Sequence, residues 1–345
     1  MRAVVMDRVA GPLEVRTVAD PAPPDGGVVV AVHATGLCRS DWHAWAGHEE
    51  LALPHVPGHE LAGVVEAVGA GVRRWAVGDR VTVPFVSGCG SCDWCRSGNT
   101  QVCPHQEQPG FTYWGSFAEY VALPAADTNL VAIPDSVSFA AAAGLGCRFA
   151  TAYRALTGRA RLLAGEWLTV VGAGGVGLSA VMIGKALGAS VIAVDRNDGA
   201  LAAAADLGAD VTLHADTADI PARVHEVTEG GSHVGLDAVG SESACATSVL
   251  SLRRQGRHVQ VGLLPPVHGH PRVPMDRVIA WELDLLGSHG MAAADYPPML
   301  AMIERGQLRP HQLIERTIGL DDVVSALPGL DTASPAGITI IDPRR

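Results

Sequence analysis

Four of the seven cysteines in this chain lie within one short segment, residues 89–103. The segment reads CGSCDWCRSGNTQVC, and its C-x2-C-x2-C-x7-C spacing puts Cys89, Cys92, Cys95 and Cys103 within reach of one ion. Four thiolates suit a tetrahedral Zn²⁺ that closes a loop and leaves no coordination position open for chemistry. The segment therefore predicts a structural zinc lobe, which only a few architectures carry.

Two other uses of four cysteines stay open on the sequence alone. An iron–sulfur cluster also takes four thiolates, although its usual spacings differ from this one. Disulfide bonds are the second alternative. A secreted disulfide framework, however, normally has an even number of cysteines spread along a smaller chain. We therefore favour zinc over both alternatives.

The length of 345 residues exceeds what one hydrophobic core usually covers, so two domains are expected. With 48% hydrophobic and 18% charged residues, the composition is that of a globular protein. A net charge of -11 and the lack of a basic run disfavour nucleic acid as a partner. Asp7 and Arg8 stand where a signal peptide would need its apolar stretch, so we expect a cytoplasmic protein.

One uncharged stretch, Trp167 to Gly184, is about as long as a membrane span. Glycines interrupt it at several positions, which a membrane helix of this length would not need. A strand, a glycine turn and a helix explain the stretch better. The sequence therefore predicts no membrane partner.

The pattern along the chain changes once. The first third has short β-branched runs bounded by Gly, Pro or Asp, such as residues 28–36 and 63–69, which predict an antiparallel, barrel-like domain. After about residue 140, apolar strands alternate with Ala-rich helices, the latter including residues 177–188, 199–208 and 243–256. Such alternation predicts βαβ units and a parallel sheet, so the fold class is α/β.

A glycine motif follows the predicted strand 167–172 and opens the next helix. Gly172, Gly174, Gly175 and Gly177 form G-x-G-G-x-G, with Val176 inside the motif. A glycine pattern alone is a weak signal, but this strand–turn–helix context is the one a Rossmann dinucleotide site requires. The glycines permit a tight turn and let the backbone approach a pyrophosphate at the helix N-terminus. We expect these residues to bind a dinucleotide.

Asp195 ends the next predicted strand, where an acidic side chain can accept hydrogen bonds from the adenosine ribose hydroxyls. It would also repel a 2′-phosphate, which favours NAD over NADP. Arg196 tempers this choice, because a guanidinium beside the site could accommodate a phosphate. An ordinary turn residue is the simpler alternative for Asp195.

Three further segments place metal-ligand side chains outside the lobe. Cys38 lies in GLCRSDWH, His59 in PGHELAG and Cys147 in GLGCRFATAY. Two thiolates and one imidazole would leave a fourth zinc position for water or substrate. Taken singly, each is more simply a buried core residue. Beside the lobe and the glycine turn, the three predict a catalytic zinc, whereas Cys245 is expected only to pack in a helix.

With these motifs in place, the chain resembles the zinc-dependent alcohol dehydrogenases of the medium-chain dehydrogenase/reductase family over essentially its whole length. The resemblance rests on GHELAGVVEAVGAGV, the four-cysteine lobe and GAGGVG, in that order. It implies a GroES-like catalytic domain over residues 1–147, a Rossmann domain over 148–288 and a C-terminal return over 289–345. It further implies NAD-dependent interconversion of alcohols and aldehydes, two zinc ions per chain, and a homo-oligomer, either tetramer or dimer.

The family's metal-site residues carry over onto matching positions. Cys38, His59 and Cys147 match the catalytic zinc ligands. Asp41 would orient the imidazole of His59, as metal-bound histidines generally require. Glu60 would lie close behind the zinc.

The resemblance also implies a proton path and a cofactor contact. Ser40 would take the proton of the alcohol and pass it through the cofactor ribose to His43 and solvent, and Arg39 matches a pyrophosphate contact. Two departures suggest weaker or differently balanced NAD binding. Asp198 begins a segment where relatives commonly have a basic residue, and Ile338 stands where many place an arginine.

The substrate pocket is defined by resemblance alone. The positions that fall near the family's substrate channel are Phe85, Phe111, Trp114 and Leu263, with Trp42 and Trp45 as further candidates. Each is as readily a core residue. Should several converge, the pocket would be apolar and suit aromatic or medium-chain primary alcohols and their aldehydes.

The same residues distinguish between this function and others that the fold supports. A polyol, threonine or amino-cyclitol dehydrogenase is the alternative, but such relatives often supply a carboxylate as the third zinc ligand, and Cys147 stands against them. A dinucleotide sensor without catalysis predicts a broken ligand or relay position, and none is broken here. A zinc-free quinone reductase would lack Cys38, His59 and the lobe.

Overall fold

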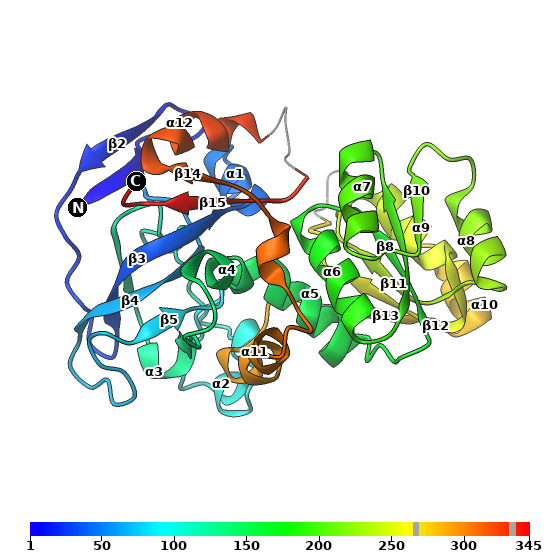
Figure 1. The fold of residues 1–345 in the computed structure, drawn as a ribbon, viewed down its shortest axis with the longest axis horizontal. Helices are drawn as coiled ribbons and strands as arrows, with labels where there is room; N and C mark the ends of the chain where they lie inside the picture. The colour runs from blue at the N-terminus through cyan, green and yellow to red at the C-terminus, as the bar shows by residue number, and fades with distance from the viewer. Residues whose placement is uncertain (265–268, 331–335) are drawn as a thin grey trace. The chain divides into compact units, whose positions relative to one another are not determined.

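The computed structural model describes residues 1–264, 269–330 and 336–345, and the chain divides into two compact units. The first unit comprises Met1–Ala150 and Gly290–Arg345, and the second comprises Thr151–His289 (Figure 1). The sequence placed these bounds at 147/148 and 288/289, in the same order of parts. Within the described ranges, every helix is too short or too polar to cross a bilayer.

The first unit is built on antiparallel strands. Its main sheet has the order β14-β15-β3-β4-β5-β7, β6 pairs with the start of β3, and β1 and β2 form a separate pair. Only β14 and β15 run parallel within these pairs. The strands are β1 (Arg2–Met6), β2 (Leu13–Thr17), β3 (Val28–Leu37), β4 (Glu60–Val68), β5 (Arg80–Thr82), β6 (Tyr120–Leu123), β7 (Val131–Ala132), β14 (Ile314–Gly319) and β15 (Ile338–Asp342).

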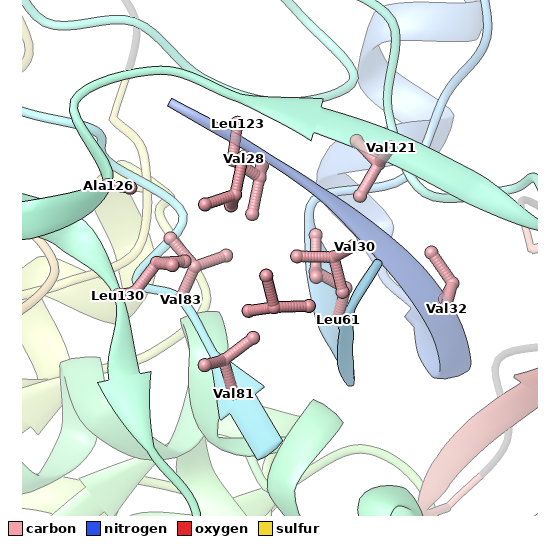
Figure 2. Close-up of a cluster of buried hydrophobic side chains, with 11 residues drawn as sticks. Val28, Val30, Val32, Leu61, Val81, Val83, Val121, Leu123, Ala126 and Leu130 are labelled. Carbon is pink, nitrogen blue, oxygen red and sulfur yellow. The ribbon is translucent and has the colours of Figure 1, made fainter. Parts of the chain in front are cut away.

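The core of this sheet follows from the period of two in its strands. Val28, Val30 and Val32 of β3 lie on one face, because successive strand side chains alternate between faces. They pack with Leu61 of β4 and Val81 of β5, and all five are fully buried (Figure 2). The rigid β3–β4 pair therefore fixes the residues that follow β3 and precede β4.

The helices of the first unit are short. They are α1 (Arg39–Trp45), α2 (Asp93–Arg96), α3 (Ala126–Asn129), α4 (Phe139–Ala143), α11 (Tyr296–Glu304) and α12 (Leu320–Gly329), and α5 (Ala150–Arg154) begins at the boundary between the units. The 3-10 or π turns are Thr100–Val102, Leu145–Phe149, Ala155–Arg159, Ala293–Asp295 and Pro310–Leu313. The sequence pattern indicated neither α12 nor β14.

The second unit contains the predicted parallel sheet, in the order β10-β9-β8-β11-β12-β13. This is the doubly wound order of a Rossmann fold, in which the first strand lies at the centre, so the predicted fold class is confirmed. Its strands are β8 (Trp167–Val171), β9 (Ser190–Asp195), β10 (Val211–His214), β11 (Ser232–Asp237), β12 (Leu252–Gln260) and β13 (Asp284–Gly287). Its helices are α6 (Gly175–Ala186), α7 (Asp198–Asp206), α8 (Ile220–Thr228), α9 (Glu242–Leu250) and α10 (Met275–Trp281).

One predicted element is wrong in its extent. The helix expected over residues 243–256 ends at Leu250, and Leu252 already begins β12. Gln255 has a φ of 58°, which a helix cannot contain. Pairing of β12 with β11 overrides the local helix preference, and the register between these strands is irregular at this point.

Candidate functional site

Cys38, His59 and Cys147 lie together in the first unit although they are far apart in the sequence. Gly36 pairs with Glu60 in the β3–β4 register, so the residue after β3 and the residue before β4 come side by side. Cys147 reaches them from the π turn Leu145–Phe149. The sulfurs, an imidazole nitrogen and a Glu60 oxygen all lie within 4.8 Å of one another. These atoms could hold one metal ion.

The imidazole of His59 is oriented for ligation. Its Nδ1 lies 2.7 Å from Asp41 Oδ1, and Asp41 Oδ2 accepts a hydrogen bond from the backbone N–H of Cys38 at 2.9 Å. Its Nε2 is buried and has no hydrogen-bond partner among the described residues. Because Nδ1 donates to the carboxylate, the lone pair falls on Nε2, as in metal-bound histidines. A buried nitrogen with an unused lone pair fits a metal.

The two thiols of this cluster are linked electrostatically. The hydrogen bond from Cys147 lowers the pKa of Cys38 well below its usual range, although burial opposes the shift. The same hydrogen bond and burial raise the pKa of Cys147. A metal that binds both sulfurs must displace the remaining proton, since ligating cysteines are thiolates.

Arg148 forms a buried ion pair with Glu60 directly behind this cluster. Its backbone N–H and Nε donate to Glu60 Oε1 at 3.1 and 3.0 Å, and Nη2 donates to Oε2. Arg148 is 7% exposed and Glu60 is fully buried. Burial raises the pKa of Glu60, and the guanidinium opposes that rise. Sequence reasoning missed Arg148; a charged residue beside Cys147 in an apolar stretch was the available signal.

The four cysteines of the lobe also converge. Their sulfurs lie within 4.8 Å of one another, with Cys89 to Cys95 at 4.0 Å and Cys92 to Cys103 at 3.7 Å. These separations exceed the roughly 2.05 Å of a disulfide. They match the edges, about 3.8 Å, of a tetrahedron with Zn–S bonds of about 2.3 Å. All seven cysteines of the chain are free, so the disulfide alternative is not supported.

Backbone N–H groups of the lobe point at these sulfurs. The N–H of Cys89 donates to Cys103 Sγ at 3.5 Å, and that of Cys92 donates to Cys89 Sγ at 3.4 Å. The hydroxyl of Ser91 lowers the pKa of Cys89 to about 5, whereas burial raises that of Cys95 to about 12. Donors aimed at sulfur stabilise thiolates, which is the form that binds zinc.

The glycine motif forms the predicted turn between β8 and α6. Gly172 has a φ of +94°, and a Cβ at Gly177 would lie 1.7 Å from the carbonyl oxygen of Gly172. Only glycine fits at these two positions. A Cβ at Gly174 would meet nothing within 4 Å, so this side of the turn is open to a ligand. Gly175 and Val176 begin α6 and are partly exposed.

Asp195 lies beside this turn at the end of β9. Its Oδ2 accepts a hydrogen bond from the N–H of Ala173 at 2.7 Å, and its Oδ1 accepts one from Asn197 at 2.9 Å. Arg196 is exposed, and its carbonyl accepts a hydrogen bond from His214. The turn and a carboxylate thus meet at the carboxyl end of the sheet, where Rossmann folds bind dinucleotides.

Helix α1 carries the residues expected to handle protons. Ser40 Oγ lies 3.9 Å from Cys38 Sγ. His43 is half-buried and its Nδ1 lies 2.8 Å from Nδ1 of His48, a residue that sequence reasoning did not single out. Burial lowers the pKa of His43, and the charges of His48 and Arg39 lower it further. Arg39 is exposed and lies 5.1 Å from the ring of Trp42.

The aromatic residues proposed for the pocket divide into two groups. Phe85 and Phe111 meet the ring of His59 edge-on, at centroid distances of 6.2 and 5.4 Å. Trp114 is 38% exposed and lines a separate cavity of about 320 Å³ with residues such as Pro21 and Tyr120.

The remaining pocket candidates have other surroundings. Trp42 and Trp45 pack against the cluster that includes Leu327 of α12. Leu263 lies in the second unit and is 64% exposed. Cys245 is buried against Val249 and neighbours of α9 and β12, as predicted.

Two family models and a curated relative match this chain. The model of the alcohol dehydrogenase GroES-like domain matches residues 24–135, and that of the zinc-binding dehydrogenases matches residues 175–305. An alcohol dehydrogenase of Geobacillus stearothermophilus is 35% identical over 94% of this chain and 95% of its own length.

Solved structures give the same result. The crystal structure of an NAD-dependent alcohol dehydrogenase superposes with a TM-score of 0.90, at 31% identity and 99% coverage of both chains. A protein described as a zinc-binding dehydrogenase from Sinorhizobium meliloti 1021, solved with NADP bound, has a TM-score of 0.89 at 25% identity and 99% coverage of both chains. The chain belongs to the zinc-dependent alcohol dehydrogenases of the medium-chain dehydrogenase/reductase family, as the sequence predicted.

Proposed function

We propose that this protein is an NAD-dependent alcohol dehydrogenase that interconverts an alcohol and its aldehyde. The observation that carries the proposal is the meeting of Cys38, Cys147 and the unpartnered Nε2 of His59. Two thiolates and one imidazole leave a fourth zinc position for substrate. Zinc bound there would act as a Lewis acid, which lowers the pKa of an alcohol.

The chain's own residues would manage the proton and the geometry. Asp41 holds His59 in the tautomer that leaves Nε2 free. Ser40, beside Cys38, accepts the proton of the alcohol, and His43 is the outer end of the path by which that proton reaches solvent. The Arg148–Glu60 pair adds no net charge behind the metal site, so the two thiolates can balance one Zn²⁺.

The second unit would bind the cofactor, whose nicotinamide ring exchanges hydride with the substrate carbon. The open side of the turn at Gly174 suits a pyrophosphate, and Gly175 and Val176 are proposed contacts. The family resemblance alone adds Arg39 as a proposed contact. The carboxylate of Asp195 supports NAD rather than NADP, because it would repel a 2′-phosphate. A relative was solved with NADP bound, and Arg196 lies next to Asp195, so the preference for NAD over NADP should be measured.

A second zinc is proposed for Cys89, Cys92, Cys95 and Cys103, with a structural role. Four sulfurs at tetrahedral spacing leave no open position for a substrate. We also propose a homo-oligomer, dimer or tetramer, in the cytoplasm. Sedimentation and cell fractionation test these two points.

The substrate class is proposed from the rings beside the metal site. Phe85 and Phe111 present apolar edges around His59, which suits aromatic or medium-chain primary alcohols. Initial rates on a panel of primary alcohols, polyols and amino alcohols, each with NAD and NADP, test the proposal. Primary alcohols with NAD should give the highest kcat/KM. Preference for threonine or polyols would support the alternative function within the family, and no turnover of any alcohol would refute the proposed activity.

A further inference from the structure

Two imidazoles are in direct contact on the surface of the first unit. His43 of α1 and His48, just beyond the helix, approach through their Nδ1 atoms at 2.8 Å. The backbone N–H of His48 also donates to the backbone carbonyl oxygen of His43 at 3.0 Å, which holds the two residues together. The ring of Trp42 packs edge-on against both, at centroid distances of 5.1 and 5.5 Å. The backbone hydrogen bond and the Trp42 ring therefore both support the contact.

This contact has a definite proton count. Two ring nitrogens at this distance share one hydrogen, so one imidazole donates through Nδ1 and the other accepts. If His43 donates, its Nε2 carries the lone pair and can accept a proton. The contact thus couples the tautomer of His43 to that of His48.

We propose that His48 acts through His43 as the next member of the proton path to solvent. This inference rests on the proposed function, in which His43 is the outer end of that path. A proton that binds His43 Nε2 releases the proton on His43 Nδ1 to His48 Nδ1, and His48 gives up its Nε2 proton to water. At each ring one N–H bond forms and one breaks, so the pair returns to neutrality. Aldehyde reduction runs the path in reverse.

Exposure and charge support this direction of transfer. His43 is half-buried, whereas His48 is exposed and can exchange protons with water. The charged groups that bear on His43 are His48, Arg39 on the same helix and Cys38 at its start. Arg39 is a cation that disfavours a charge held on His43, so a proton arriving there is readily passed outward.

The test compares His48→Asn with the unaltered zinc-loaded enzyme from about pH 5.5 to 9. Alcohol oxidation should slow about tenfold below pH 7, less than the ~10²–10⁴ contributed by a group that contacts the reacting atoms. Added imidazole should restore the rate, and the solvent deuterium isotope effect on kcat should rise. His311→Asn, which changes another exposed histidine of the same unit, should behave as the unaltered enzyme.

The double variant His43→Gln/His48→Asn separates this inference from the proposed function. It should be no slower than His43→Gln alone, because His48 acts only through His43. An unchanged pH profile in His48→Asn, beside a clear effect of His43→Gln, would overturn the role of His48 and leave the enzyme's function intact. A loss in His48→Asn that imidazole fails to restore, or an equal loss in His311→Asn, would also overturn it. If His43→Gln behaves as the unaltered enzyme, neither histidine lies on the proton path, and the inference is overturned.

Discussion

Replacing Arg148 tests the electrostatic balance of the metal site. Arg148→Met keeps a long apolar side chain but removes the donors that pair with Glu60. Glu60 is fully buried and would then lose the cation that compensates its charge. Removal of one partner of a buried ion pair typically destabilises a protein by about 3–5 kcal/mol. We expect Arg148→Met to lower the free energy of unfolding by an amount within that range.

The assay is urea unfolding of the zinc-loaded protein, followed by fluorescence, with two matched variants. Arg223→Met removes a partner of the exposed Arg223–Glu226 pair in the second unit and should change stability by less than about 1 kcal/mol. Glu60→Gln/Arg148→Met removes both charges and should recover about half of the loss. A loss below about 1 kcal/mol in Arg148→Met would refute the reasoning, because it would mean that Glu60 needs no buried cation.

Other substitutions test the remaining parts of the account. Gly177→Ala should destabilise the second unit by about 1–3 kcal/mol, because its Cβ would overlap the Gly172 carbonyl oxygen; Gly174→Ala should spare stability but weaken NADH binding in a fluorescence titration. Asp195→Asn should raise the KM for NAD about tenfold, the equivalent of losing one charged hydrogen bond, and should leave the KM for NADP unchanged or lower. Cys92→Ser should release the lobe zinc and lower the melting temperature; an unaltered zinc content would contradict the four-thiolate site.

Much of this organisation could be read from the sequence because it rests on local patterns. The spacing of the four lobe cysteines falls within one loop, and the Gly172–Gly177 turn sits between a clear strand and a clear helix. Both signals are short-range, so the local sequence alone determines their geometry. The convergence of Cys38, His59 and Cys147 is different, because it depends on the β3–β4 register and on the turn after α4. The sequence predicted this site from the ligand types beside the lobe and the glycine turn, and the family resemblance then matched the same three residues to the zinc ligands.

The residues that sequence reasoning missed act through long-range contacts. The role of Arg148 depends on its ion pair with Glu60, which belongs to a strand distant in the sequence. In the sequence His48 is only a polar residue after α1, and the fold brings its ring into contact with His43. Helix α12 was missed although its sequence carries a signal, because its buried residues Leu320, Val323 and Leu327 lie at helical spacing. Strand β14 carries little such signal, because most of its side chains are polar or exposed and it is defined by its pairing with β15.

The central claim is that the chain holds two metal sites with separate roles. Metal analysis of the purified protein and of Cys38→Ser, run beside an NAD-linked alcohol assay, tests it most directly. We expect about two zinc ions per unaltered chain, and about one per Cys38→Ser chain together with loss of turnover while NADH still binds. Full activity in Cys38→Ser, or one zinc or none in the unaltered active protein, would contradict it.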